Sequence, residues 1–261
     1  MGEKSAVMYK FWSLGRVCLL GGALVCGYGS AARADDFGSI SGQIVYDGNV
    51  PDTKILIKKG DPAAKDPTIC AAADLPDEGL IIDKETKGIA NVFIYLEKAP
   101  AKIHPDMKKP KEAEVVFDQK NCQFLPHALI VNAEQGVRVK SGDPISHNTH
   151  LGGIYNSENR TIAPDDRTGV LFKVKAEKIP VSVVCDIHSF MKAYWLVLPH
   201  GYGTATDAKG NFKIENLPAG KHEFRIWHEK VGFIDRKYAA TVKGGEETKL
   251  DPVKVAPSKF K

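Results

Sequence analysis

The chain has 261 residues, of which 43% are hydrophobic and 26% are charged, and its net charge at pH 7 is +4. This length is enough for one large domain or two modest domains, each with a hydrophobic core of its own. The composition is that of an ordinary globular protein with some extra Gly and Pro, which excludes a compositionally biased chain.

The first 34 residues have the features of a secretory signal peptide. Lys4, Lys10 and Arg16 form a basic start, residues 17–32 are apolar and Gly-rich, and an A-x-A cleavage site ends at Ala34. The apolar run is short for a membrane span. We therefore predict cleavage of residues 1–34 and a periplasmic or secreted protein. An uncleaved N-terminal anchor is the first alternative, and a lipoprotein modified at Cys26 is a weaker one.

Cleavage would remove four basic residues and one acidic residue, so the net charge would fall from +4 to +1. No later run of the sequence is long and apolar enough to cross a bilayer, and no membrane span is expected after cleavage. A small lysine run at 108–111 is mixed with acidic residues, which indicates a solvated linker rather than a nucleic-acid-binding patch. No nucleic-acid partner is expected.

Three cysteines remain after the predicted cleavage: Cys70, Cys122 and Cys185. In an oxidising compartment an odd number leaves one thiol unpaired or with another role. The simplest division is a Cys70–Cys122 disulfide with Cys185 kept for a metal ion. A disulfide from Cys185 to either of the other two is the alternative, because sequence alone does not show which pair comes within bonding distance.

The first third of the chain contains two strand patterns and two irregular segments. Residues 39–46 and 89–97 alternate as strands do, while residues 49–80 are predicted to form a long loop and residues 99–111 a linker. A second group of short, β-rich segments follows, and between them residues 141–166 are predicted to be loop. The strands expected in this group cover residues 114–117, 128–132, 137–140, 170–174, 180–185 and 193–198.

The last third predicts a hairpin over residues 202–214, with an Asp-x-x-Gly turn, and a second turn at 216–220. Further strands are expected at residues 221–228, 239–242 and 248–255. No segment of ten or more residues has a convincing helical period. Many short strands separated by turn residues predict an all-β fold built from β-sandwiches.

One loop carries three metal-binding side chains within seven residues, Cys185-x-x-His188-x-Phe190-Met191, between two predicted strands. Cys and Met are soft ligands and His is intermediate, and a Cys-His-His set with a weak axial Met is the usual arrangement of blue-copper sites. The loop lacks a second His. His147 and His150 lie in an earlier segment that could meet the loop at one end of a sandwich.

These two motifs resemble those of amicyanin, a family of small periplasmic blue-copper proteins with the cupredoxin fold, which plastocyanin shares. The resemblance covers about residues 112–199 and implies a Greek-key sandwich that binds one type 1 copper ion. It implies four copper ligands, two residues that support them, and a non-ligand role for His150. The implied ligands are His147, Cys185, His188 and Met191, with Asn148 and Phe190 beside them.

The sequence departs from the family pattern at Ser141, where Asn is common, and at Val184, where an aromatic residue is common. Three alternatives stay open. His150 replaces His147 as a ligand in one, and the histidines are ordinary loop residues in another. Half of a zinc site is the third, although no second pair with zinc spacing exists and Met is a poor zinc ligand.

The flanking segments, residues 38–100 and 200–257, resemble the carboxypeptidase-regulatory-like, transthyretin-like β-sandwich. Most of that match is Thr206-Asp207-x-x-Gly210-x-Phe212-x-Ile214-x-x-Leu217-Pro218-x-Gly220. The resemblance implies a discontinuous domain interrupted by the cupredoxin-like domain, with a simple tandem as the alternative. The whole layout is similar to secreted bacterial proteins described as methylamine-utilisation-like.

The sequence thus predicts a copper-binding protein for one-electron transfer, with a cytochrome or a dehydrogenase as its redox partner. A non-redox binding or scaffold protein with a metal-free cupredoxin fold is one alternative, and copper storage or delivery is another. A copper enzyme is not expected, because four protein ligands leave no open position for a substrate.

Overall fold

The structure is a computed structural model that describes residues 36–260. Almost all of its regular structure is strand, and its helices are single turns: α1 (Pro67–Cys70), α2 (Pro105–Lys108) and the 3-10 helix Pro257–Phe260. The predicted all-β fold is therefore confirmed. The predicted signal peptide lies outside the described residues. Among the described helices, none has the length and apolar character that a membrane span requires.

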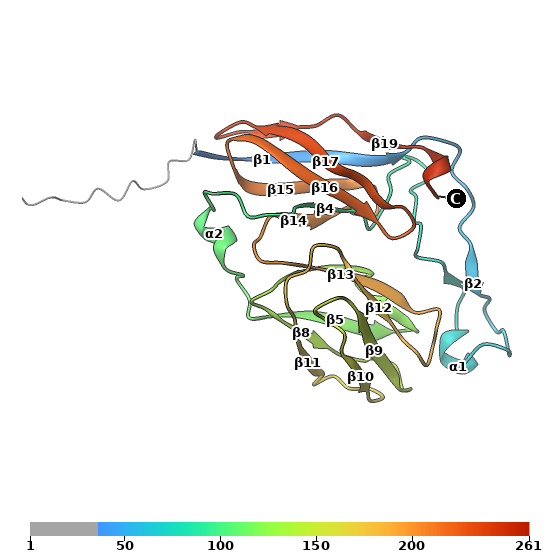
Figure 1. Cartoon of the computed structure of the whole chain (residues 1–261). Coiled ribbons are helices and arrows are strands. Elements are labelled where there is room, and N and C mark those ends of the chain that lie inside the picture. The colour runs from blue at the N-terminus through green and yellow to red at the C-terminus, as the bar shows by residue number, and fades with distance from the viewer. Residues whose placement is uncertain (1–35, 261) are drawn as a thin grey trace, which may run out of the picture. The chain divides into compact units, whose positions relative to one another are not determined.

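Strands between residues 114 and 198 form two sheets, which we call the central sandwich (Figure 1). The first has the order β10-β9-β12-β13-β7, with bounds Asn159–Ile162, His147–Gly152, Val181–Val184, Lys192–Leu198 and Ala128–Asn132. The second has the order β11-β8-β5-β6, with bounds Val170–Lys173, Gly136–Val139, Glu114–Lys120 and Gln123–Leu125. Both sheets contribute to one hydrophobic core, in which Trp195 lies edge-on to Phe117 and Phe172.

The remaining long strands form two further sheets, which we call the flanking sandwich. One contains β15, β1, β18 and β19, with bounds Asn211–Pro218, Phe37–Tyr46, Glu247–Lys249 and Val253–Val255. The other has the order β14-β4-β16-β17, with bounds Gly203–Ala205, Phe93–Leu96, Gly220–His228 and Gly232–Val242. Their shared core includes Ile40, Ile94, Leu217 and Phe224, all fully buried.

Within the flanking sandwich, strands from both ends of the described chain pair with each other. β1 pairs with β15, β18 and β19, and β4 pairs with β14 and β16. Among the described residues, the strands of the central sandwich pair only with one another. The predicted domain limits of 38–100 plus 200–257 and 112–199 stay a prediction, because the described residues belong to one compact unit.

The prediction of a hairpin over residues 202–214 is wrong. The turn itself forms, because Gly210 donates its backbone N–H to the Asp207 carbonyl at 3.0 Å and adopts a φ of 77°, which favours glycine. However, β14 before the turn pairs with β4, and β15 after it pairs with β1 in the other sheet. The turn therefore connects two sheets, and local turn chemistry did not determine which strands pair.

Two segments predicted as loops contain regular structure. Residues 141–166 include β9 and β10, and β9 is a central strand because it pairs with β10 on one side and β12 on the other. The polar composition of β9, His-Asn-Thr-His-Leu-Gly, concealed it from a search for alternating apolar residues. Residues 49–80 contain α1 between the paired short strands β2 (Ile55–Ile57) and β3 (Leu75–Pro76).

The strand β4 is buried on both faces. Ile94 and Leu96 point into the core of the flanking sandwich, while Phe93 and Tyr95 form a separate cluster with Leu196 and Leu198 of β13. The Tyr95 hydroxyl also donates a 2.9 Å hydrogen bond to the Lys178 carbonyl. The two sandwiches therefore share an apolar contact through β4 and β13.

A buried ion pair also connects the two sandwiches. His127, just before β7, is 7% exposed, and its Nε2 lies 2.5 Å from Glu229 Oε1 in the turn between β16 and β17. Glu78, after β3, lies 3.7 Å from the other ring nitrogen. Burial opposes protonation of His127, but the hydrogen bond to Glu229 and the charges of the two glutamates outweigh it and raise the pKa to about 9.

The His127 ion pair predicts a pH-dependent stability. Because the folded-state pKa of about 9 exceeds the ordinary value of 6.5, this contribution is complete below pH 6.5 and is lost as the pH rises through 9. We expect it to be on the order of 1–3 kcal/mol of unfolding free energy. Urea denaturation at several pH values should show that His127→Gln removes this part of the loss, whereas the half-exposed control His150→Gln keeps it. Parallel pH profiles for the protein and His127→Gln would contradict the assignment.

Candidate metal centre

Strand pairing brings the two predicted metal-binding segments to the same end of one sheet. His147 is the first residue of β9, and Cys185 directly follows β12, which pairs antiparallel with β9 in a register that places Val184 opposite His150. The loop after Cys185 is tight, because Met191 donates its N–H to the His188 carbonyl at 2.8 Å and Cys185 donates its N–H to the Met191 carbonyl at 3.3 Å.

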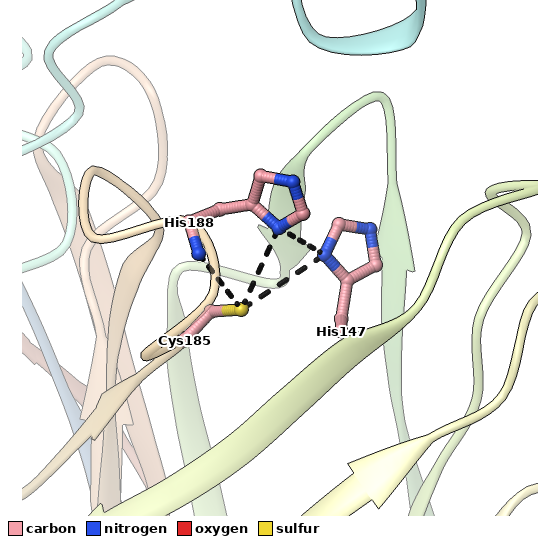
Figure 2. A group of neighbouring side chains, drawn as sticks. All are labelled: His147, Cys185 and His188. Atoms are coloured by element: carbon pink, nitrogen blue, oxygen red, sulfur yellow. Dashed lines mark hydrogen bonds between the residues drawn. The ribbon is translucent and has the colours of Figure 1, made fainter. Parts of the chain in front are cut away.

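Three ligand atoms converge in a buried space (Figure 2). Cys185 Sγ lies 4.0 Å from His147 Nδ1 and 3.7 Å from His188 Nδ1, and the two nitrogens are 3.1 Å apart. The three residues are at most 1% exposed. A circle through three atoms with these separations has a radius of about 2.1 Å, which matches the roughly 2.0–2.3 Å bonds of a transition metal such as zinc to nitrogen and sulfur. The site therefore fits a transition-metal ion.

The second nitrogen of each imidazole is held by a carboxylate. His147 Nε2 lies 2.9 Å from Asp143 Oδ2, and His188 Nε2 lies 2.8 Å from Asp66 Oδ2. Asp143 also accepts hydrogen bonds from the backbone N–H groups of Asn121 and Cys122 at 2.6 and 2.9 Å. An imidazole that donates its Nε2 proton to a carboxylate binds a metal ion through Nδ1, and this is the usual arrangement around metal-bound histidine.

The charges of the site favour ionisation of the thiol. Burial raises the pKa of Cys185, but the hydrogen bond from His147 and backbone N–H groups outweigh it, so the pKa is lowered. Burial opposes protonation of His147, yet Asp143 and Cys185 raise its pKa to about 9. Burial lowers the pKa of His188, and the neighbouring His147 lowers it further. A metal ion that binds here would take the place of the His147 Nδ1 proton, and a thiolate with two imidazoles is a donor set suited to a soft or intermediate metal ion.

Asn148 attaches the ligand loop to β9. Its side-chain oxygen accepts hydrogen bonds from the backbone N–H groups of Asp186 at 2.7 Å and Ile187 at 3.3 Å. Its side-chain nitrogen donates to Asn159 Oδ1 and Asp186 Oδ2 at 2.9 and 2.8 Å. In addition, the Asn148 backbone N–H donates to Cys185 Sγ at 3.5 Å. These contacts give Asn148 a position from which it holds both the sulfur and the loop.

The other predicted site residues lie close to this cluster in different ways. Met191 is 2% exposed and belongs to the same hydrophobic core as Cys185. The Phe190 ring is partly buried and lies 5.8 Å from the His188 ring, centroid to centroid. His150 is half-exposed and pairs with Asp186 at 3.1 Å instead of joining the ligand atoms. The structure thus brings His147, and not His150, to Cys185 and His188.

Cys70 and Cys122 form a disulfide, with their Cα atoms 5.2 Å apart, and Cys185 is the one free cysteine among the described residues. This pairing removes a second cluster of candidate ligands, Cys122, Asp143 and His147, from consideration as a metal site, because the Cys122 sulfur is already bonded.

Two residues of the candidate site, Asp143 and Asp66, could not be recognised from the sequence. Asp143 lies four residues before His147, a separation that suggested no contact in a segment predicted as loop. Asp66 lies 122 residues before His188 and belongs to a segment predicted to be irregular, so no sequence pattern linked the two.

No protein-family model matches the sequence, and no curated protein is significantly similar to it. Among solved structures, amicyanin from Paracoccus versutus is 18% identical over 41% of this chain and 98% of amicyanin, with a TM-score of 0.27. A copper-containing nitrite reductase from Thermus scotoductus is 16% identical over 36% of this chain and 24% of the reductase, also with a TM-score of 0.27. These scores are low, and the function is inferred below from the side chains of the chain itself.

The hydrogen bonds of Asn148 predict that the loop after Cys185 becomes more mobile when the Asn148 side chain is removed. Asn148→Ala leaves the Asp186 and Ile187 N–H groups without their acceptor, so we expect a loss of about 1–3 kcal/mol in unfolding free energy. Hydrogen exchange at these two amides should become at least tenfold faster. Asn159→Ala is the matched control, since it removes a partner of Asn148 but keeps both acceptor bonds to the loop. Equal exchange rates in the two variants would contradict this role.

Proposed function

We propose that the protein binds one copper ion in a type 1 site formed by His147, Cys185, His188 and Met191, and that it transfers single electrons. The observation that carries the proposal is the convergence of Cys185 Sγ and the two imidazole Nδ1 atoms, at separations of 3.1–4.0 Å, in a buried space. A thiolate and two imidazoles are the trigonal donor set of blue-copper sites.

The donor set favours copper over zinc. Structural zinc sites have four strong ligands. On this loop the carboxylate of Asp186 is already bonded to Asn148, His150 and Asn159, which leaves the thioether of Met191, a poor zinc ligand, as the further donor. A weak axial thioether is common at copper sites that exchange electrons. When bound in such a site, copper supplies a one-electron couple whose two oxidation states tolerate the same geometry.

The residues of the chain supply rigidity and exclude water. Asp143 and Asp66 orient the two imidazoles, and Asn148 fixes the ligand loop. The three converging side chains are at most 1% exposed, so little solvent would have to reorient during electron transfer. An electron carrier needs a fixed set of donors, because its metal ion changes charge while the ligands keep their positions.

We further propose that the protein acts outside the cytoplasm and is not an enzyme. The predicted signal peptide supports the first point, and the four protein donors, which leave no open position for a substrate, support the second. The partner would then be a redox protein such as a cytochrome or a dehydrogenase.

The proposal is tested by spectroscopy of the purified, copper-loaded protein. We expect one copper ion per chain and strong visible absorption from thiolate-to-copper charge transfer, together with a type 1 electron paramagnetic resonance spectrum. Cys185→Ser should abolish the visible band, because the thiolate is its source, while His150→Asn should leave it unchanged. A colourless, copper-free protein under these conditions would refute the proposal and would favour a non-redox binding role.

Electron transfer and copper delivery use the same residues and need a second measurement. For a carrier, we expect electron exchange with a small soluble cytochrome to be fast, and copper loss to a chelator to be slow because the buried donors are held in place. The ratio of these two rates, measured on one preparation, distinguishes the functions. Copper release that outpaces electron exchange would identify a storage or delivery protein.

A further inference from the structure

A single disulfide connects the two segments that orient the candidate ligand histidines. Cys70 ends the short helix α1, within residues 58–74, a segment that we call the strap. Cys122 lies in the turn between β5 and β6. Both sulfur-bearing residues are at most 2% exposed, and the bond joins parts of the chain that are 52 residues apart.

On the Cys70 side, the connection leads to His188. The Cys70 backbone N–H donates to the Asp66 carbonyl at 2.9 Å, so the cysteine and the aspartate belong to the same helical turn. Asp66 has a left-handed backbone with a φ of 51°, and its side chain reaches His188 Nε2 at 2.8 Å. The side chain of His188 is fully buried, while that of Asp66 is 39% exposed. The strap therefore covers the outer edge of this imidazole.

On the Cys122 side, the connection leads to His147. Asn121 and Cys122 are the two central residues of the β5–β6 turn, since Lys120 pairs with Gln123. Both have positive φ angles, of 53° and 57°, which direct their successive N–H groups to the Asp143 carboxylate. Asp143 in turn bonds His147 Nε2.

We propose that the Cys70–Cys122 disulfide is a positioning device for the metal centre, which fixes Asp66 and Asp143, and through them both ligand imidazoles, at one time. This inference rests on the proposed copper binding. Asp66 and Asp143 are positioning residues, because their carboxylates bond the imidazole nitrogens that face away from the cluster. Hydrophobic contacts of Cys70 and Ala71 in the core hold the strap as well, but among the described residues the disulfide is the one covalent bond between side chains that connects it to the turn that holds Asp143.

A double-mutant cycle on the full chain tests the device. Residues that orient metal ligands typically affect metal affinity 10–100-fold. We expect Asp66→Asn to weaken Cu²⁺ binding by at least about tenfold when the disulfide is present, and Cys70→Ser combined with Cys122→Ser to weaken it by a similar factor. Asp66→Asn should then cost less than about threefold in the disulfide-free protein, because the strap no longer holds the carboxylate in place.

Two controls separate positioning from a general loss of stability. Leu217→Ala removes a fully buried side chain from the core of the flanking sandwich, to which neither cysteine belongs, and should destabilise the fold without changing copper affinity. The second control needs no metal. In nuclear magnetic resonance spectra of the metal-free protein, the bonded Nε2–H groups of His147 and His188 should give slowly exchanging signals, and the disulfide-free variant should lose that of His188 and broaden that of His147.

The outcomes are distinct. Unchanged copper affinity without the disulfide, or additive effects of Asp66→Asn and disulfide removal, would overturn the inference. So would persistence of both imidazole signals in the disulfide-free variant. If the parent protein binds no copper, the proposed function fails, and the imidazole signals of the metal-free protein still decide whether the disulfide positions the histidines.

Discussion

The pairing of β9 with β12 is the constraint on which the candidate metal centre depends. It places His147, at the start of one strand, beside Cys185, which follows the end of the other. A shift of one residue in this pairing would turn every side chain of β9 to the opposite face. The register is fixed from both sides, because β9 also pairs with β10, and its Leu151 packs in the same core as Val183 of β12. The polar strand that escaped sequence detection is thus held by its neighbours more than by its own composition.

Three buried histidines of this protein use the same electrostatic arrangement for different purposes. Each places Nε2 against a carboxylate, with Asp143 at His147, Asp66 at His188 and Glu229 at His127. A buried polar group without a partner is costly, so each contact removes a penalty of folding. At His147 and His188 the Nδ1 atoms face the Cys185 sulfur, whereas at His127 a second carboxylate lies near Nδ1 and the result is an ion pair between the sandwiches.

How much could be predicted from the sequence follows from the range of the interactions involved. The Cys185–Met191 loop was recognisable because its donors are close in sequence and lie between two apolar strands, and His147 was recognisable through its motif. The all-β fold followed from turn residues and alternation. The pairing of β14 and β15 was mispredicted, since the turn between them is compatible with a hairpin but the burial of Phe93 and Tyr95 of β4 against Leu196 sets a different sheet order. Asp66 lay beyond any sequence rule because only tertiary structure brings it to His188.

The donors of the candidate centre are positioned by contacts within the chain itself. Its donors come from β9 and the β12–β13 loop, and their supports come from the β5–β6 turn, the segment before β9 and the strap. Ordering each of these segments costs conformational entropy. The free energy gained from strand pairing and core burial offsets this cost. An ion that binds to donors held in place by the chain does not have to order them, so more of the metal–ligand bond energy is expressed as affinity. The same rigidity suits a change of one charge, because buried donors that keep their positions, and little nearby water, leave few atoms to move when an electron arrives or leaves.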